Sequence, residues 1–386
     1  MRHGIYFEQS DCNLSAFQSL ISRSLEHSDV PFADEIRSNI PIYDMRRLSA
    51  CLHSERRAEL LAEWARVFAQ MSGVVVLKNS YQDLACIDAA SEIYRDLIAE
   101  EKEQSSGGDH FAATGANDRV WNSLQKLCLR NPEVFAKYFA NETISAVCEA
   151  WLGPWYQVTA QVNQVRPGGR AQTAHRDYHL GFQSEADALR FPAHVHDLSP
   201  LLTLQGAIAH VDSPVESGPT KLLPFSQLYR AGYVAYRKEE FAQTFEMNFV
   251  QLPLAKGDLV FFNPALFHAA GENTSEDAHR LVNLLQVSSA MGRATEAVDR
   301  SAMCRALYPV LSDLWQIQEL STPELNAVIG ATAEGYSFPT NLDTDPPIDG
   351  MVPDSQAALM TRAILANIAP GEFFLMLDEL DARRKA

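Results

Sequence analysis

Hydrophobic positions along the chain recur first at helical spacing, then at strand spacing, and finally at helical spacing again. Residues 54–70 begin with a serine that can cap a helix, and their apolar positions lie three or four residues apart, which predicts an amphipathic helix. The β-branched run at 73–77 is typical of a buried strand. Helical spacing returns over residues 84–102 and 131–152, so this part of the chain is expected to be mostly helical around one strand.

Between about residues 155 and 290 the pattern changes to short apolar runs separated by Gly, Pro and Asp. Each run is short enough for a strand, and each is followed by a turn signal. The predicted strands cover residues 156–165, 171–182, 201–211, 220–223, 249–254, 259–263 and 281–288. Such a series is typical of a β-sandwich or barrel of jelly-roll type.

The pattern divides the chain into three parts. Residues 1–72 are expected to form an N-terminal helical arm, residues 73–290 the β domain, and residues 291–386 a C-terminal helical extension. The predicted fold is therefore a mainly β core with α additions: a double-stranded β-helix (a cupin-like jelly roll) flanked by helices. Within the β domain, residues 105–118 are small and polar, which is typical either of a surface loop or of a lid over a pocket.

Composition narrows the possible functions. The formal net charge of the 386 residues is −17, which argues against a nucleic-acid surface and against binding to an anionic membrane. The six cysteines show no CxxC spacing, and we expect free thiols in a reducing compartment. No apolar run reaches about 18 residues, and the N-terminus has no signal-peptide pattern. We therefore expect a cytoplasmic protein that acts on a small molecule.

The candidate chemistry lies in the segment 171–182. If this segment is extended, the side chains of His175 and Asp177 point to one side and Arg176 points to the other. Two histidines and one carboxylate are the usual protein ligands of non-haem Fe(II). The second histidine must come from elsewhere in the chain, and His268 at the end of an apolar run is the best candidate.

Arg280 opens the strand predicted at 281–288, twelve residues after His268. An arginine that points into a β core is costly to bury unless it is paired. A dicarboxylate co-substrate would supply a partner, because a planar guanidinium binds a carboxylate through two parallel hydrogen bonds.

These residues resemble the phytanoyl-CoA dioxygenase family of Fe(II)/2-oxoglutarate oxygenases, over residues 73 to about 288. The resemblance is carried by His175-Arg176-Asp177, the distant His268, Asn273 and Ser275 in the turn that follows, Arg280, and the segment 218–227. Phe225 and Gln227 stand where the family commonly has Gly and His, and Ala270 stands where a small hydroxyl residue is common. The spacing from His268 to Arg280 is also one residue longer than usual.

The resemblance implies a reaction and a set of roles. His175, Asp177 and His268 would bind Fe(II), and Arg280 would bind the C5 carboxylate of 2-oxoglutarate. Gln164 and Gln205 would contact the 2-oxo acid. Reaction with O2 would release succinate and CO2 and hydroxylate, or otherwise oxidise, a small organic metabolite. The carboxylate of Asp177 favours hydroxylation, since related halogenases lack it.

Several alternatives stay open. On a helix, His175 and His179 would form a zinc pair, although the nearby glycines and proline favour a strand. His194, His196 and Asp197 could form another ligand cluster or simply lie in a solvated loop, while His210 is most simply structural. The same triad could also serve a zinc hydrolase or a non-catalytic binding protein.

The form of the substrate is open as well. A CoA thioester would require a basic groove for its phosphates, and Arg166, Arg170 and Arg176 lie close together in the sequence. The negative net charge instead favours a free metabolite.

Overall fold

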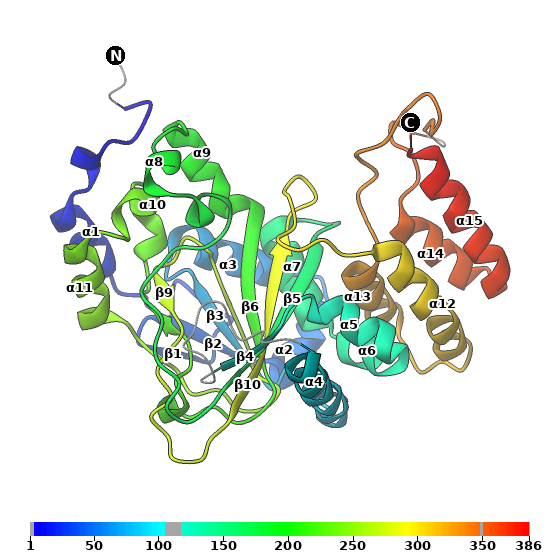
Figure 1. Ribbon diagram of the computed structural model, residues 1–386, viewed down its shortest axis with the longest axis horizontal. Helices are drawn as coiled ribbons and strands as arrows, with labels where there is room; N and C mark the ends of the chain where they lie inside the picture. The colour runs from blue at the N-terminus through cyan, green and yellow to red at the C-terminus, as the bar shows by residue number, and fades with distance from the viewer. Residues whose placement is uncertain (1–3, 105–116, 348–349, 386) are drawn as a thin grey trace.

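An eight-stranded sheet lies at the centre of the computed structural model, which describes residues 4–104, 117–347 and 350–385 (Figure 1). The strand order of this main sheet is β1-β2-β3-β8-β6-β10-β5-β4, and every neighbouring pair is antiparallel except the parallel pair β2 and β3. Its strands are β1 (Glu35–Arg37), β2 (Ile40–Asp44), β3 (Val74–Lys78), β4 (Asn117–Val120), β5 (Gln157–Val165), β6 (Thr203–Ala209), β8 (Leu259–Phe262) and β10 (Arg280–Ser288).

A second, smaller sheet packs against one face of the main sheet. It pairs β7 (Lys221–Leu222) with β9 (His268–Ala269), and single bridges extend it to His175 on one side and to Val250 on the other. One apolar cluster joins the two sheets, because inward residues of the main sheet pack against residues of the smaller layer. Members of this cluster include Val76, Ala207, Val260, Leu222, Leu252 and Leu266. The centre of the chain is thus two β layers with a core between them.

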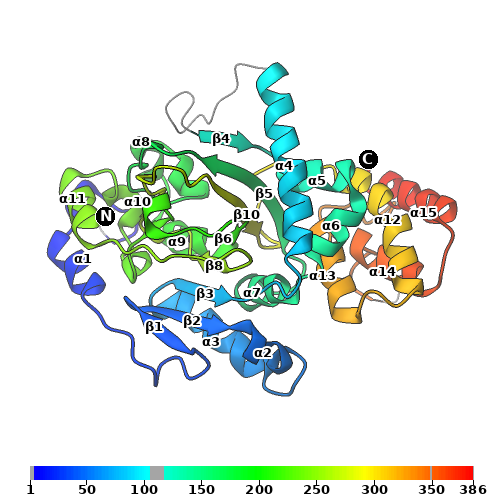
Figure 2. The same cartoon turned by 90° about the horizontal axis from the view of Figure 1, so that it is seen from below.

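Helices cover the other face of the main sheet (Figure 2). The helices that pack most extensively against it are α3 (Arg57–Gln70), α4 (Ala85–Gln104), α5 (Ser123–Arg130), α7 (Glu142–Leu152) and α13 (Thr322–Thr332). Their buried side chains join those of the outward-facing strand residues in the largest apolar cluster of the protein. Because successive side chains of each strand point to opposite faces, the main sheet has an apolar core on each of its two faces.

The remaining helices lie around this core. They are α1 (Leu14–Ile21), α2 (Met45–Leu52), α6 (Pro132–Phe139), α8 (Glu185–Ala188), α9 (Ala193–Leu198), α10 (Gly232–Ala235), α11 (Glu239–Asn248), α12 (Arg300–Gln316), α14 (Gln356–Leu365) and α15 (Pro370–Arg383). Short 3₁₀ helices are η1 (Gln9–Asp11), η2 (His179–Phe182), η3 (Ser199–Leu202), η4 (Val215–Ser217) and η5 (Ser226–Leu228). Among the described residues, no helix is both long and apolar enough to cross a membrane.

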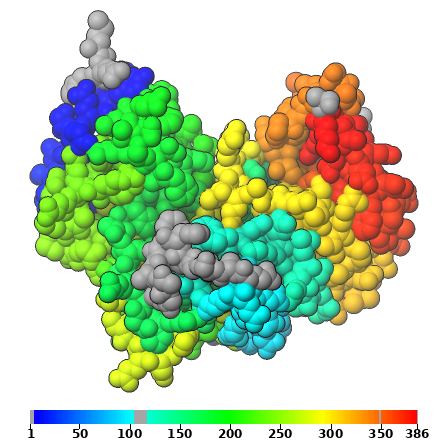
Figure 3. All heavy atoms as spheres, viewed as in Figure 1, coloured from blue at the N-terminus to red at the C-terminus, as the bar shows by residue number. Residues whose placement is uncertain are grey.

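The C-terminal helices form a lobe of their own, which a notch separates from the part around α8 and α9 (Figures 1 and 3). Arg300 joins this lobe to the main sheet. Its Nη2 donates to the carbonyl oxygen of Val158 on β5 (3.0 Å), and its Nη1 donates to the carbonyl oxygen of Thr332 at the end of α13 (3.1 Å). A buried guanidinium is stable only when it has such acceptors, so this contact fixes the lobe to β5.

Most elements predicted from the sequence are present, and four predictions need correction. The segment 171–182 is not a regular strand, because it forms only a single bridge at His175 and its last four residues form η2. The first 72 residues are not only helical, because β1 and β2 lie within them and extend the main sheet. Residues 131–152 form two helices, since Asn141 interrupts the pattern and its side chain caps α7 (Asn141 Oδ1 to Ile144 N, 3.1 Å). Residues 249–254 contribute only single bridges instead of a strand.

The predicted fold class, a β core with α additions, is present in its general form. A large mixed sheet with many helices is present, as a β core with α additions requires. The proposed lid at 105–118 falls almost entirely on residues outside the described part of the chain.

Candidate active site

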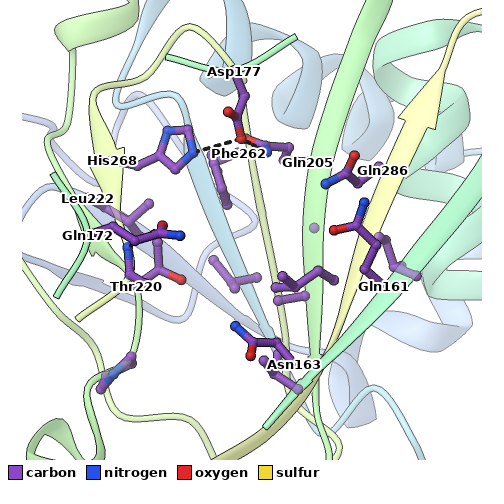
Figure 4. Close-up of a pocket in the computed structure, with 18 of the residues that line it drawn as sticks. Gln161, Asn163, Gln172, Asp177, Gln205, Thr220, Leu222, Phe262, His268 and Gln286 are labelled. Carbon is purple, nitrogen blue, oxygen red and sulfur yellow. Dashed lines mark hydrogen bonds and ion pairs between the residues drawn. The ribbon is translucent and has the colours of Figure 1, made fainter. Parts of the chain in front are cut away.

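His175, Asp177 and His268 meet at one point between the two sheets. Figure 4 shows two of them, Asp177 and His268, side by side at the cavity. The backbone of His175 exchanges two hydrogen bonds with that of His268 (3.0 and 3.1 Å), and Asp177 N donates to Pro264 O (3.0 Å). Because the segment is extended here, His175 and Asp177 point to the same side. One ligand atom from each of the three residues lies within 4.8 Å of the other two, and no other such cluster of metal-binding side chains occurs in the described residues.

Each histidine is oriented by a backbone carbonyl. His175 Nδ1 lies 2.8 Å from Thr173 O, and His268 Nδ1 lies 2.8 Å from Leu266 O. A carbonyl oxygen only accepts, so Nδ1 carries the proton and Nε2 presents its lone pair. The Nε2 atoms lie 3.6 Å (His175) and 3.3 Å (His268) from the two carboxylate oxygens of Asp177. Both lone pairs therefore face the carboxylate, as ligands of a shared ion do.

The protonation states also suit a divalent cation. Burial, and then the nearby His268, lower the pKa of His175, so its imidazole is neutral at neutral pH. Burial alone raises the pKa of the Asp177 carboxyl, but the two neighbouring histidines and the hydrogen bond from Gln205 outweigh it and lower that pKa. Metal binding requires neutral imidazoles and an ionised carboxylate. Two histidine nitrogens with one carboxylate therefore fit Fe(II).

Arg176 points to the opposite side, as predicted, and is fully enclosed. Its Nη2 donates to Ser226 O (2.7 Å) and Tyr229 O (2.8 Å), and its Cζ lies 5.1 Å from the ring centre of Tyr233. A Cβ atom at position 232 would lie 1.9 Å from the Arg176 Cζ, so Gly232 is required for this packing. Arg176 thus anchors the ligand-bearing segment from behind.

A cavity of about 560 Å³ opens beside the triad, between the two sheets. Apolar residues of both layers form much of its wall, among them Val76, Leu222, Leu252, Val260, Phe262, Val282 and Leu284. Uncharged polar side chains form most of the remainder (Figure 4). A cavity of this size and lining is typical of a site for a small molecule.

Arg280 lines the same cavity. Its side chain is only 6% exposed, and burial lowers the pKa of its guanidinium to about 10. Within the described residues its guanidinium forms no ion pair with a carboxylate, and its Nε has no hydrogen-bond partner. A buried, unpaired cation is costly, so the arrangement indicates an anionic ligand that binds inside the cavity.

The two glutamines predicted to contact the co-substrate have different outcomes. Gln205 lines the cavity, but its Nε2 donates to Asp177 Oδ2, so its present partner is a triad residue. Gln164 does not line the cavity, and that prediction is corrected. On β5 the cavity-facing residues are Gln161 and Asn163, and an odd number of positions from Gln161 places Gln164 on the other face of the strand.

The other candidate histidines do not join the triad. His179 begins η2 with a φ of +36°, so it does not share a helix with His175 and the zinc-pair alternative is wrong. His196 Nε2 lies 3.0 Å from Ala188 O, while His194 is exposed on α9. His210 is buried between Ser91 Oγ (2.8 Å) and Tyr138 Oη (2.6 Å), which confirms its structural role.

Sequence reasoning missed several cavity residues. Besides Gln161 and Asn163 on β5, the cavity is lined by Gln286 on β10, by Thr220 next to β7, and by Phe182 at the end of η2. Alternation of side chains along β5 and β10 identifies the residues that face the cavity, but only when the register of each strand is known. Thr220 lies across from Ala270 at the end of the β7–β9 ladder, so a hydroxyl is present on the wall where Ala270 lacks one.

Comparison with protein families adds the observation that decides the relationship. The family model for phytanoyl-CoA dioxygenase (PhyH) matches residues 69–281, which is more than half of the chain. The chain belongs to the phytanoyl-CoA dioxygenase family. The matched region includes His175, Asp177, His268 and Arg280. This PhyH protein is therefore a 2-oxoglutarate-dependent oxidoreductase that uses iron, and the triad described above fits that ion.

Individual relatives are distant. The PhyH protein is 24% identical over 240 residues to dioxygenase trt7 of Aspergillus terreus, covering 61% of this chain and 74% of that one. It is 27% identical over 143 residues to dioxygenase andF of Emericella variicolor, covering 35% of this chain and 43% of that one. Among solved structures, the α-ketoglutarate-dependent carbocyclase SnoK from nogalamycin biosynthesis is 21% identical with a TM-score of 0.44, covering 71% of this chain and 93% of that one.

One departure from the family pattern has a structural explanation. Phe225 stands where a glycine is common, and its φ of +68° lies in the left-handed region that favours glycine. Its side chain is buried, and its backbone N–H donates to Ser72 O (3.1 Å). The turn therefore keeps a glycine-like conformation with a packed aromatic side chain.

Proposed function

We propose that this PhyH protein is an Fe(II)/2-oxoglutarate-dependent dioxygenase that hydroxylates, or otherwise oxidises, a small organic metabolite with release of succinate and CO2. One observation carries the proposal: the His175–Asp177–His268 triad lines the same cavity as Arg280, a buried guanidinium with no carboxylate partner among the described residues. The two facing β layers are further proposed to be the two sides of a double-stranded β-helix. The cytoplasmic location and the lack of nucleic-acid binding stay predictions from the sequence.

Each residue has a defined task in this proposal. His175, Asp177 and His268 would hold the iron, with both imidazoles already oriented through their Nδ1–H groups. Bound there, iron and 2-oxoglutarate supply the oxidising power, as O2 is consumed and the oxo acid loses CO2. Arg280 would bind the distal carboxylate of 2-oxoglutarate and fix its direction in the cavity. The apolar wall would exclude water from the reacting groups.

Arg280 also separates the proposal from its alternatives. A zinc hydrolase could use the same three ligands, but it has no task for a buried cation in the cavity wall. A binding protein that had lost its activity would not be expected to keep all four groups in place. The intact carboxylate of Asp177 favours hydroxylation over halogenation.

The arginines near the triad segment do not form the basic groove that a CoA thioester would require. Arg166 Nη2 is paired with Asp118 (2.5 Å), and Arg176 is enclosed behind the triad, so neither is available for a phosphate group. Arg170 alone is exposed. Together with the net charge of −17, this favours a free metabolite.

Purified protein supplied with Fe(II), 2-oxoglutarate and O2 is expected to release succinate slowly, even without its true substrate. The reason is that the groups proposed to bind iron and 2-oxoglutarate are already in place without a substrate. The measurement is succinate formed over time, with Fe(II) replaced by Zn(II) as a control. Succinate release at the same rate with Zn(II), or none with Fe(II), would contradict the proposal.

Replacing Gln205 with leucine is expected to weaken divalent-metal binding roughly 10- to 100-fold, the usual effect of losing a residue that orients a metal ligand. Gln205 Nε2 donates to Asp177 Oδ2, and leucine removes that bond while keeping most of the volume. The measurement is a titration with Co(II), followed by its visible absorption. Gln243→Leu, at an exposed position of α11, is the control, and equal affinities in both variants would show that Gln205 does not position Asp177.

A further inference from the structure

Three glutamines form a cluster on the cavity wall next to the triad. Gln161 lies on β5, Gln205 on β6 and Gln286 on β10, which are neighbouring strands. Gln205 and Gln286 are direct partners in the register of β6 and β10, and Gln161 lies diagonally from Gln286. Such neighbours on one face are within reach of each other's long side chains. Figure 4 shows the three carboxamides side by side near Asp177, and we call them the amide cluster.

The hydrogen bonds of the amide cluster are incomplete. Gln161 Oε1 accepts from Arg119 Nη1 (2.8 Å), and Gln205 Nε2 donates to Asp177. The Oε1 atoms of Gln205 and Gln286 are buried without a partner, and the Gln286 carboxamide makes no hydrogen bond within the described part of the chain. Buried polar groups in proteins are nearly always satisfied. The two unpaired buried oxygens of these described residues therefore indicate that a polar ligand binds at this wall.

The position of the cluster separates it from the site expected for 2-oxoglutarate. Arg280 lies six residues before Gln286 on β10, so the two residues face the cavity at different levels along the same strand. A 2-oxo acid that extends from the triad towards Arg280 leads away from Gln286. The amide cluster thus lines a part of the cavity left for the primary substrate.

The surroundings of the cluster are mostly apolar, apart from Arg119, which also lines the cavity and donates to Gln161. Phe262 is the register partner of Gln205 on β8, and Leu284 is the register partner of Gln161 on β10. Phe182 also lines the cavity, and its ring is 57% exposed, so it is accessible to a ligand. Within the described residues, Asp177 is the single acidic side chain on the cavity wall.

We propose that the amide cluster recognises a carbonyl or hydroxyl oxygen of an uncharged, largely apolar substrate, whose carbon skeleton packs against Phe262 and Phe182. A carboxamide offers both a donor and an acceptor but no charge, so it suits a neutral oxygen better than a carboxylate or a phosphate. A polar site of this kind rejects an analogue that lacks the oxygen, because its own groups are then left unpaired. This substrate class rests on the proposed function and makes it more specific.

The test uses small rigid probes of one shape: camphor (a ketone), borneol (an alcohol), bornane (the hydrocarbon) and ketopinic acid (the ketone with a carboxylate). Each is titrated calorimetrically into anaerobic protein loaded with Co(II) and 2-oxoglutarate. Camphor or borneol is expected to bind at least about tenfold more tightly than bornane, and more tightly than ketopinic acid. Gln286→Met and Gln161→Met keep the length of the side chain. In both variants the ratio of the affinity for camphor or borneol to the affinity for bornane is expected to fall towards one. Gln243→Leu is expected to keep it.

The outcomes separate this inference from the function on which it rests. No detectable binding of camphor or borneol, tighter binding of ketopinic acid or octanoyl-CoA, or an unchanged preference in both methionine variants would overturn the neutral-substrate proposal. The comparison of probes in the unmodified protein decides the question even if a variant does not fold. Failure of the unmodified protein to bind 2-oxoglutarate in the same experiment would instead refute the oxygenase function.

Discussion

His268→Ala is expected to abolish turnover and to weaken Fe(II) binding by more than about 100-fold, since it removes a ligand and not merely a residue that orients one. His268 Nε2 lies 3.3 Å from Asp177 Oδ2, so its loss leaves one imidazole and one carboxylate to hold the ion. Two ligands no longer form the facial triad of two histidines and one carboxylate that binds non-haem iron. The measurement is an anaerobic titration with Fe(II) or Co(II), together with succinate release.

The control for this variant is His194→Ala, which removes an exposed histidine outside the cavity. It is expected to leave both quantities unchanged. Because His268 is itself buried, the melting temperature of His268→Ala must be measured alongside. A folded variant with unaltered metal affinity would remove His268 from the proposed ligand set.

Arg280→Ala is expected to lower the affinity for 2-oxoglutarate on the order of a hundredfold or more. Breaking a buried ion pair by removal of one partner costs roughly 3 to 5 kcal/mol, which corresponds to such a factor. Lysine keeps the charge but cannot form two parallel hydrogen bonds, so Arg280→Lys is expected to lie between the unmodified protein and Arg280→Ala. Metal affinity is expected to survive both changes.

The measurement is an anaerobic titration of 2-oxoglutarate into the Fe(II) protein, followed by the charge-transfer absorption of the complex. Arg170→Ala, at an exposed position in the turn before the triad segment, controls for the loss of one positive charge. If Arg280→Ala bound 2-oxoglutarate as tightly as the Arg170→Ala control, the main argument for a 2-oxoglutarate site would be lost.

Two physical rules made much of the triad predictable, and the position of His268 at the end of an apolar run identified its third member. Alternation along an extended segment placed His175 and Asp177 together with Arg176 behind them, and the preference of iron for two imidazoles and a carboxylate required a second histidine. In the structure, the β-bridge between His175 and His268 brings the two imidazoles to the same place. The assignment of roles to these residues in catalysis is still a prediction.

The rest of the site depended on strand register, which the sequence does not contain. Gln164 was expected to contact the 2-oxo acid from the family resemblance alone, which does not fix which face of β5 each residue takes, and a shift of one residue reverses the face. The contact from Gln205 to Asp177 joins residues 28 positions apart through tertiary packing alone. Likewise, β1 and β2 were missed because short strands at a sheet edge carry little periodic signal.

The pairing of β2 with β3 has a consequence for any attempt to express the catalytic part by itself. A fragment that begins at Gly73, where the family resemblance starts, would lack β2 and leave the backbone N–H and C=O groups of β3 open along one side. Unpaired strands of this kind join the strands of other molecules and promote aggregation. β2 therefore covers this edge of β3, and a soluble truncation must retain at least Ile40–Asp44.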